Sequence, residues 1–434
     1  IGAFGLGLIY TIALKGLSIK RLPMALKLMF QHDKDAEGEV SPFGAICTTL
    51  AGNLGTGNIV GVATALVAGG PGALFWIWIV AALGMACKYA EGLLAVKYRT
   101  VDADGHALGG PFYYIERGLG KKWKPLASLF AFFGAIACAG SIGTTTQING
   151  IVDSINNVVD PSLEHTVHIG FLNLEYSYVT IIVSIVLVVV VSCILAGGLK
   201  RITQVAEIVV PVMAVIYIVY CLATLLCNIP KIPSAFASVF VGAINPSAVT
   251  GGAIGSFFIV LQKGVARGVF SSETCLGSAP IAAAAAKTDS PVKQGLVTMN
   301  SNFFDTLVVC TSTGIAIIMT DAWNLGVDGV TVTTRAFQMG VPFLPEWFAT
   351  VIMMLCLVFF AFTTIIGWEY YGERCWEYLF KGNVKACRVY RIIYVAVMFF
   401  GAYMTVGAIW TISDIFTAAM AFPNMIALLL LVKD

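Results

Sequence analysis

Long apolar stretches are the feature of this 434-residue sequence that most limits its fold. Eleven stretches approach or exceed about 20 residues, the length that an α-helix needs to cross the hydrocarbon core of a bilayer. Because 58% of the residues are hydrophobic and only 12% are charged, the sequence predicts an all-α integral membrane protein. The expected spans, the first of them partial, cover roughly residues 1–17, 42–67, 72–96, 125–152, 176–196, 204–226, 251–284, 294–319, 347–371, 392–409 and 412–432.

The basic residues orient these spans. If the loop after the first span is cytoplasmic, nearly all of the 26 Lys and Arg residues fall on the cytoplasmic side, with Lys88 counted among them. Only Lys231 and Arg335 fall outside, while Lys263 and Arg267 lie within a span. Cytoplasmic loops of membrane proteins carry such an excess of positive charge. We therefore expect a multi-pass plasma-membrane protein with its N-terminus outside and its C-terminus in the cytoplasm.

The spans divide into an extra first helix and two sets of five. An odd number of spans in each set gives the two sets opposite orientations, as in an inverted repeat. The predicted units are residues 1–40 (extra helix and cytoplasmic loop), 41–229 (first five-helix repeat), 230–248 (extracellular connection) and 249–434 (second repeat).

The first helix of each repeat carries weak helix formers at mid-depth. Residues 49–61 read TLAGNLGTGNIVG, and in residues 251–268 Gln262, Lys263 and Gly264 interrupt an apolar run. Glycines in membrane helices often serve only close packing, but two interruptions at corresponding positions indicate discontinuous helices around a midplane binding site. Unwinding frees amides that suit a carboxylate and carbonyls that suit a cation or an ammonium group.

Three long motifs resemble one transporter family. They are GGPGALFWIWIVAALG (residues 69–84, with Ile77 where a methionine is usual), ETCLGSAPIAAAAAKTDSPVKQG (273–295) and TTIIGWEYYGER (363–374). Together they resemble the alanine or glycine:cation symporter family. The resemblance implies a fold similar to the sodium:neurotransmitter symporters, with discontinuous first and sixth core helices. It also implies inward transport of alanine, of either hand, or glycine together with sodium.

The resemblance also suggests site residues. The amides of Thr56 and Gly57 would face the substrate carboxylate, and the carbonyl of Asn53 its ammonium group. The sodium ligands would be the carbonyls of Ala51, Leu54 and Phe360 and the hydroxyls of Thr363 and Thr364, which are hard oxygen donors as an alkali cation requires.

Three further side chains complete the expected substrate site. Trp368, one helical turn after Thr364, would limit substrates to small side chains, or would instead face lipid. Gln147 would contact the substrate, or would instead make an interhelical hydrogen bond. Phe258 resembles an aromatic lid at the second break, or packs between helices.

The sequence departs from the neurotransmitter-symporter pattern in places. Ile259 stands at a sodium-ligand position, and Gly61 stands where an outer arginine gate would be, so no such ion-pair gate is expected. Lys263 could replace the missing cation or could reach toward the cytoplasm. The intramembrane acids are Glu207, Asp305 and Asp414; each could relay protons or pair with a polar neighbour, and we assign none to the substrate site.

Other function classes fit less well. The sequence lacks HExxH, P-loop and GxSxG motifs, and its four histidines fall in polar loops, so neither an enzyme nor a nucleotide-driven pump is expected. The net charge of +2 indicates no nucleic-acid partner, and the eleven cysteines have no metal-binding spacing. A channel is disfavoured because the two interruptions have unequal contents. Proton coupling in place of sodium stays open, and no cofactor is expected besides Na⁺ as coupling ion.

Overall fold

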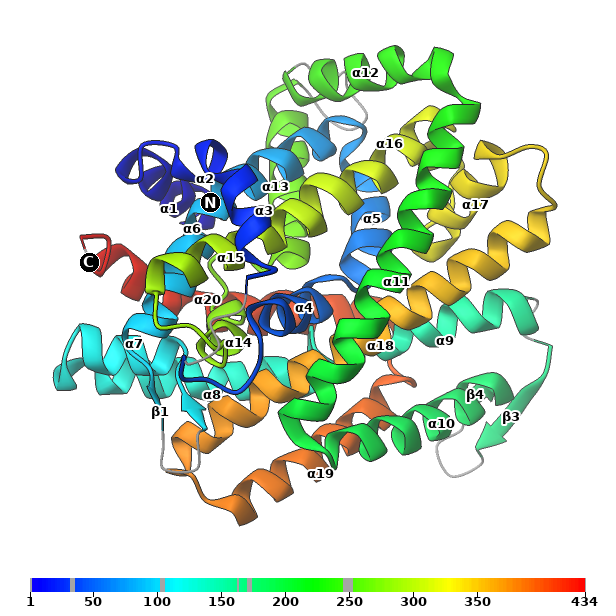
Figure 1. The fold of residues 1–434 in the computed structure, drawn as a ribbon. Helices are drawn as coiled ribbons and strands as arrows, with labels where there is room; N and C mark the ends of the chain where they lie inside the picture. The colour runs from blue at the N-terminus through cyan, green and yellow to red at the C-terminus, as the bar shows by residue number, and fades with distance from the viewer. Residues whose placement is uncertain are drawn as a thin grey trace.

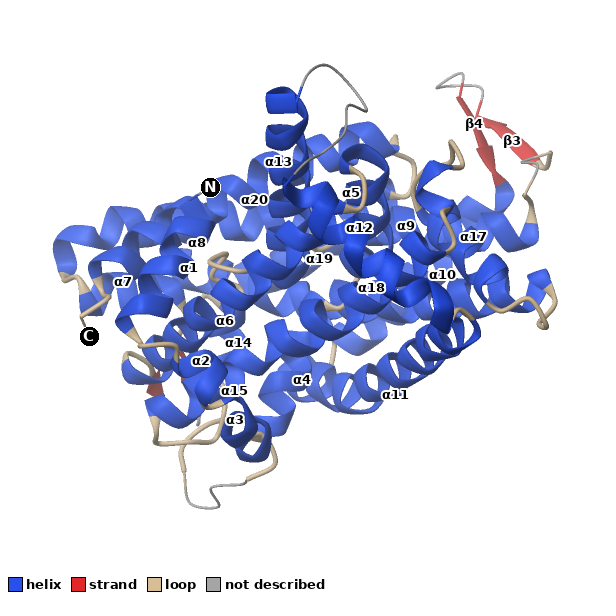
Figure 2. Cartoon of the chain, turned by 90° about the horizontal axis from the view of Figure 1, so that it is seen from above, coloured by secondary structure: helices blue, strands red, loops and turns tan. Residues whose placement is uncertain are grey.

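The computed structural model describes residues 2–31, 36–101, 106–161, 164–169, 174–244 and 253–433, and nearly all of its regular structure is helical (Figure 2). Within this part of the chain, 7 helical stretches are long and apolar enough to cross a membrane, or 8 if one bent pair is a single span. The chain is therefore a multi-pass membrane protein. The seven stretches are α6 (Gly72–Lys97), α8 with α9 (Lys121–Val159), α10 (Tyr178–Leu195), α11 (Gly198–Cys227), α15 to α16 (Pro291–Met319), α18 (Glu346–Leu379) and α20 (Val406–Leu430).

The predicted count of eleven spans is not confirmed. Helix α1 (Gly2–Ala13) has 12 residues and is short for a span. Helix α19 (Val384–Gly401) begins earlier than predicted and includes Lys385, Arg388 and Arg391 in its sequence. A span in the hydrocarbon core would bury these charges unless they reach the interface.

Several segments predicted as loops contain short elements. In chain order they are α2 (Leu17–Lys20), α3 (Leu22–Leu28), α7 (Pro111–Gly118), η2 (Lys121–Trp123), η3 (Ile229–Lys231), α12 (Ile232–Ile244), η5 (Ala322–Asn324) and α17 (Val330–Gly340). The structure also contains two antiparallel pairs of short strands. Thr100–Val101 (β1) pairs with Ala107–Leu108 (β2), and Thr166–Ile169 (β3) pairs with Leu174–Ser177 (β4) in the register Thr166 to Ser177.

The first predicted interruption is confirmed. Helix α4 (Pro42–Asn53) ends at Asn53, and the chain resumes through the π-helical segment η1 (Gly57–Gly61) into α5 (Val62–Gly69) with a bend of 52°. The start of α4 is fixed locally, because Ser41 caps it with a hydrogen bond from the Gly44 amide and Pro42 occupies the first turn. The weak helix formers of this stretch therefore do interrupt the helix.

The second interruption lies elsewhere than predicted. Helix α13 (Ala253–Ser272) runs unbroken through Gln262, Lys263 and Gly264, and the break falls at residues 273–278, before α14 (Ala279–Ala284). Gln262 and Lys263 lie on the exposed face of α13, and a Cβ at Gly264 would come within 2.5 Å of the Ala73 carbonyl oxygen. The glycine thus allows α13 to pack closely on α6, which needs no break.

Two helices deviate from α geometry where none was expected. Helix α8 (Lys124–Gly140) stops before α9 (Thr145–Val159), and the π-helical segment η4 (Phe303–Cys310) separates α15 (Pro291–Asn302) from α16 (Thr311–Met319). Such irregularities in membrane helices survive where they are buried in protein, and π-helical turns often mark functional sites.

Helices of the two predicted repeats pack against each other and do not form separate units. Helix α6 contacts α13 and α15, α8 contacts α18, and α5 runs beside α13 (Figure 1). The largest buried cluster joins residues from both repeats. All cysteines are unpaired, and all but Cys193 and Cys227 are buried. This packing brings the two interruptions to the interior of the bundle.

Candidate functional site

A cavity of about 390 Å³ leads into the bundle and reaches the first interruption. At one end it is lined by Asp160 and Asp328, which lie in loops, and at the other by Thr56. Helix α9 forms much of one wall through Asn149 and Asp153. The first interruption is therefore accessible from the side on which these loops lie.

The backbone freed at the first interruption finds side-chain partners. The Thr56 amide donates to Gln147 Oε1 at 3.0 Å, and the Gly55 amide donates to Asn58 Oδ1 at 3.0 Å. Gln147 is buried near the start of α9, where its Nε2 donates to the Ile142 carbonyl at 2.9 Å. The expected interhelical hydrogen bond of Gln147 is thus present, and it reaches one of the amides expected to face a substrate carboxylate.

Oxygen atoms predicted as sodium ligands lie together between the first interruption and α18. Thr364 Oγ1 lies 3.1 Å from the Leu54 carbonyl oxygen and 3.0 Å from the Phe360 carbonyl oxygen. Thr363 Oγ1 is also 3.0 Å from the Phe360 carbonyl oxygen. Next to them, Gly367 lets α18 approach the backbone of Ala51 and Gly52 closely. These are carbonyl and hydroxyl oxygens, a donor set that fits a hard alkali cation.

The second interruption holds a buried carboxylate that sequence reasoning missed. Glu273 has a φ of +50°, an uncommon conformation for a non-glycine residue, and is 1% exposed. Its Oε1 accepts a hydrogen bond from Trp368 Nε1 at 2.9 Å, and its Oε2 accepts one from Ser278. The signal for this break was Pro280 after Gly277, because proline is favoured in the first turn of a helix.

Trp368 connects the two interruptions. Its indole Nε1 lies 3.2 Å from the Gly52 carbonyl oxygen as well as 2.9 Å from Glu273 Oε1. A further hydrogen bond joins Asn53 Nδ2 to the Ser272 carbonyl at 3.3 Å. Trp368 is 0% exposed, so the alternative that it faces lipid is wrong.

The lid position predicted at Phe258 is wrong. Phe258 lies well before the second break, inside unbroken α13, and its side chain is 59% exposed. The sequence predicts the break at Gln262–Gly264, whereas α13 continues to Ser272. For the same reason the hypothesis that Lys263 supplies positive charge at the break is wrong. Phe270, near the end of α13, is the buried aromatic residue that contacts the first interruption, beside Gly57.

An arginine from another helix lies beside Gly61, the position at which the sequence has no arginine. Arg267 Nη1 on α13 lies 3.6 Å from Asp414 Oδ1 on α20, and the guanidinium lies 4.1 Å from the ring centroid of Trp410, which lines the cavity. A Cβ at Gly61 would be 3.9 Å from Arg267 Cδ. The arginine therefore comes from α13 and occupies the space beside Gly61.

The other intramembrane acids pair with polar neighbours. Asp305, at η4, accepts hydrogen bonds from Asn58 at 2.6 Å, from Ser271 at 3.0 Å and from Thr306 at 2.5 Å. Ser41 Oγ donates to Glu207 at 3.3 Å. The Asp305 cluster thereby joins η1 to η4 and the end of α13.

Lys88 was counted with the cytoplasmic loops, and this was wrong. It lies inside α6, is 0% exposed, and its Nζ has no hydrogen-bond partner in the described part of the chain. One turn later, Glu91 Oε1 accepts from Asn424 Nδ2 at 2.8 Å, and the same amide donates to the Cys275 carbonyl at 2.9 Å. Charged groups buried in a membrane protein are rare and mark functional regions.

Comparison with known proteins identifies relatives over the whole chain. The family described as the sodium:alanine symporter family matches residues 1–434. The sodium/alanine symporter AgcS of Methanococcus maripaludis is 45% identical over 436 residues, which cover 98% of this chain and 90% of that protein. The probable sodium/glutamine symporter GlnT of Bacillus subtilis is 35% identical over 429 residues, covering 98% and 84%.

A solved structure has a similar fold. The crystal structure of MhsT in complex with L-phenylalanine superposes with a TM-score of 0.62, at 14% identity, over 91% of this chain and 89% of that chain. At this level of identity the likeness concerns the fold alone.

Proposed function

Because the chain belongs to the sodium:alanine symporter family and is thus a transporter rather than an enzyme, we propose that it imports small neutral amino acids, alanine and glycine, together with sodium by alternating access. The N-terminus would lie outside and the C-terminus in the cytoplasm. One observation carries the proposal. The interrupted first helix turns backbone groups toward side chains of α9 and α18, and Thr56 of this interruption also lines the cavity.

The substrate would bind at the first interruption. The amides of Thr56 and Gly57 would bind the carboxylate, and the carbonyl of Asn53 would accept from the ammonium group. The hydrogen bond between Gln147 and the Thr56 amide supports this, because it presents a polar group that can exchange partners with a carboxylate. A helix terminus with free amides favours a negative charge.

Trp368 would limit the size of the substrate side chain. Its burial and its two hydrogen bonds, to Gly52 and Glu273, support a rigid wall beside the first interruption. Relatives named for alanine and for glutamine indicate that the size limit differs among members of the family.

Sodium would be held by the carbonyls of Ala51, Leu54 and Phe360 with the hydroxyls of Thr363 and Thr364. The spacing of about 3 Å among four of these groups supports a shared ligand. The ion would fix the interrupted helix on α18, and the same helix would hold the substrate. Each ligand would then favour the conformation that binds the other, which is coupling by linkage.

The test is uptake of labelled alanine into liposomes that contain the purified protein, with sodium and pH gradients imposed separately. We expect accumulation to require the sodium gradient, to saturate with alanine, and to continue without a pH gradient. Accumulation driven by the pH gradient alone would favour a proton-coupled carrier of the same fold. Non-saturable flux without accumulation would favour a channel.

A further inference from the structure

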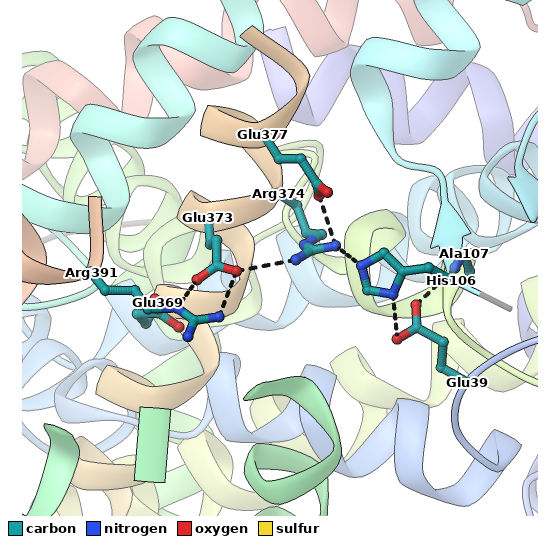
Figure 3. A network of polar contacts seen from close by, with 8 residues as sticks. All are labelled: Glu39, His106, Ala107, Glu369, Glu373, Arg374, Glu377 and Arg391. Carbon is teal, nitrogen blue, oxygen red and sulfur yellow. Dashed lines mark hydrogen bonds and ion pairs between the residues drawn. The ribbon is translucent and has the colours of Figure 1, made fainter. Parts of the chain in front are cut away.

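A network of charged side chains ties α18 to loop segments at the end of the bundle opposite the cavity entrance. It includes Glu39, which precedes α4, His106, which directly precedes β2, and Arg374 near the end of α18 (Figure 3). The start of α17, at Val330, lines the cavity, and α18 begins after α17, at Glu346, whereas Arg374 lies near its other end. Under the proposed orientation the network therefore lies on the cytoplasmic side.

The His106 ring lies between a carboxylate and a guanidinium group. Its Nδ1 lies 3.0 Å from Glu39 Oε2, and its Nε2 is hydrogen-bonded to Arg374 Nη1. The amide of Ala107 donates to the other oxygen of Glu39 at 2.8 Å, so Glu39 is attached to the hairpin that carries His106. The ring thus connects this hairpin and the segment before α4 to α18 (Figure 3).

Arg374 also has acidic partners of its own on α18. Its Nη1 lies 2.7 Å from Glu377 Oε2, and its Nη2 lies 3.2 Å from Glu373 Oε1. Arg391 of α19 donates to Glu373 Oε1 at 2.9 Å. The guanidinium therefore keeps two carboxylates if it loses the histidine.

The pattern of donors fixes the protonation state of the ring. A guanidinium can only donate, so Nε2 of His106 must accept from Arg374. The ring proton is then on Nδ1, where it is donated to the Glu39 carboxylate. A second proton, on Nε2, would place a donor and a positive charge against the guanidinium and would end that contact.

Taking the alternating-access function above as its basis, we propose that His106 is a pH-sensitive link across the cytoplasmic entrance. The neutral ring joins the hairpin to Arg374, and a proton taken up at Nε2 releases α18 and favours opening of this side.

The direction of the pKa change on opening depends on which charged groups stay close to the His106 ring. The hydrogen bond to Glu39 raises the pKa of His106 above its ordinary value, while burial and Arg374 act against this, and Glu377 raises the pKa by a smaller amount. Opening would remove burial and both α18 charges, of which Arg374 is the stronger, but Glu39 would stay with the hairpin. The pKa of His106 is therefore higher in the open form, and acidification favours that form.

The experiment measures hydrogen–deuterium exchange of the whole protein in detergent at pH 6 and pH 8, corrected for intrinsic exchange. We expect protection of residues 106–108 and 374–379 to fall at pH 6 in the wild type, by up to about tenfold for each unit of pKa difference between the two forms. His106→Gln should keep the pH 8 protection at both pH values, because its amide can donate to Glu39 and accept from Arg374. His106→Lys, with a fixed charge, should show low protection at both.

His165→Gln is the matched control. His165 lies 3.5 Å from Asp160, at the cavity entrance, and its substitution should leave the wild-type response of residues 374–379 intact. A pH response that persists in both His106 variants would overturn the proposal. Because exchange is read without transport, failure of alanine uptake would count against the proposed function and would leave this result separate.

Discussion

The two interruptions of the bundle are built from different chemistry. The first, at residues 54–56, presents backbone groups to neutral partners, with Thr56 bonded to Gln147 and the Leu54 carbonyl bonded to Thr364. The second, at residues 273–278, contains the buried carboxylate of Glu273 in a left-handed conformation, bonded to Trp368 and Ser278. The backbone groups of the first interruption can therefore exchange their partners for a ligand, whereas the second interruption holds the Trp368 side chain in place.

The largest effect is expected from filling the first interruption. A Cβ at Gly55 would lie 2.6 Å from Thr364 Oγ1 and 2.8 Å from Gln147 Oε1. Gly55→Ala should therefore push these groups apart and reduce sodium-driven alanine uptake by more than about tenfold, since overpacking a filled site costs about 1–3 kcal/mol. Gly5→Ala, where nothing lies within 4 Å, is the control. Full uptake by the Gly55 variant would show that this backbone is not at the site.

The next effect concerns the oxygen cluster between the first interruption and α18, which contains no residue of the second interruption. Thr364→Ala removes the hydroxyl that contacts the carbonyls of Leu54 and Phe360. The sodium concentration for half-maximal alanine uptake should rise about tenfold, as expected for one polar contact to a charged group. Thr350→Ala, on the same helix but near its first residue, should leave it unchanged. An unchanged sodium dependence in the Thr364 variant would contradict the placement.

A smaller effect should separate the second interruption from the first. Glu273→Ala removes the acceptor of the Trp368 indole, whereas Glu273→Gln retains one. If Glu273 fixes the wall, the Ala variant should admit valine or leucine several-fold better relative to alanine, and the Gln variant less so. Trp368→Ala should do so more strongly, because one methylene changes discrimination by about 10-fold or more. If all three variants reject larger amino acids equally, Trp368 does not limit the size of the substrate.

The smallest effect is expected at Phe258, which lies outside both interruptions. Its side chain is 59% exposed on α13, so Phe258→Ala should change alanine uptake by less than about twofold, in line with other exposed substitutions. Phe270→Ala is the comparison, because Phe270 is buried against Gly57. Uptake that falls equally in both variants would restore Phe258 as a candidate lid.

Much of the candidate site was predictable because its signals are local. Glycine and asparagine within residues 49–61 weaken any helix that contains them, so the first interruption followed from the sequence. Phe360, Thr363 and Thr364 were placed beside it by resemblance, and Thr364 Oγ1 lies 3.1 Å from the Leu54 carbonyl oxygen. The identity of the sodium and substrate ligands stays a prediction.

The errors have a common physical cause. The polar residues Gln262 and Lys263 predict a break because they interrupt an apolar run, but both lie on an exposed face of an unbroken helix. Lys88 read as a loop residue because its charge suggests exposure, but it is buried in α6. Gly61 read as the loss of an ion pair, yet Arg267 reaches that space from another helix. In each case the environment of the side chain is set by how the helices pack in the tertiary structure.

The sequence by itself determined that this chain crosses the membrane repeatedly, that one span is interrupted near residues 54–56, and that it is related to sodium-coupled symporters. These properties depend on apolar length, on helix propensity and on motifs, all of which are local. Only the tertiary structure decided that the second interruption lies at Glu273, that Trp368 bridges both, and that His106 connects Glu39 to Arg374. These depend on which helices meet, and a contact between residues tens to hundreds of positions apart cannot be recognised from the sequence of either segment alone.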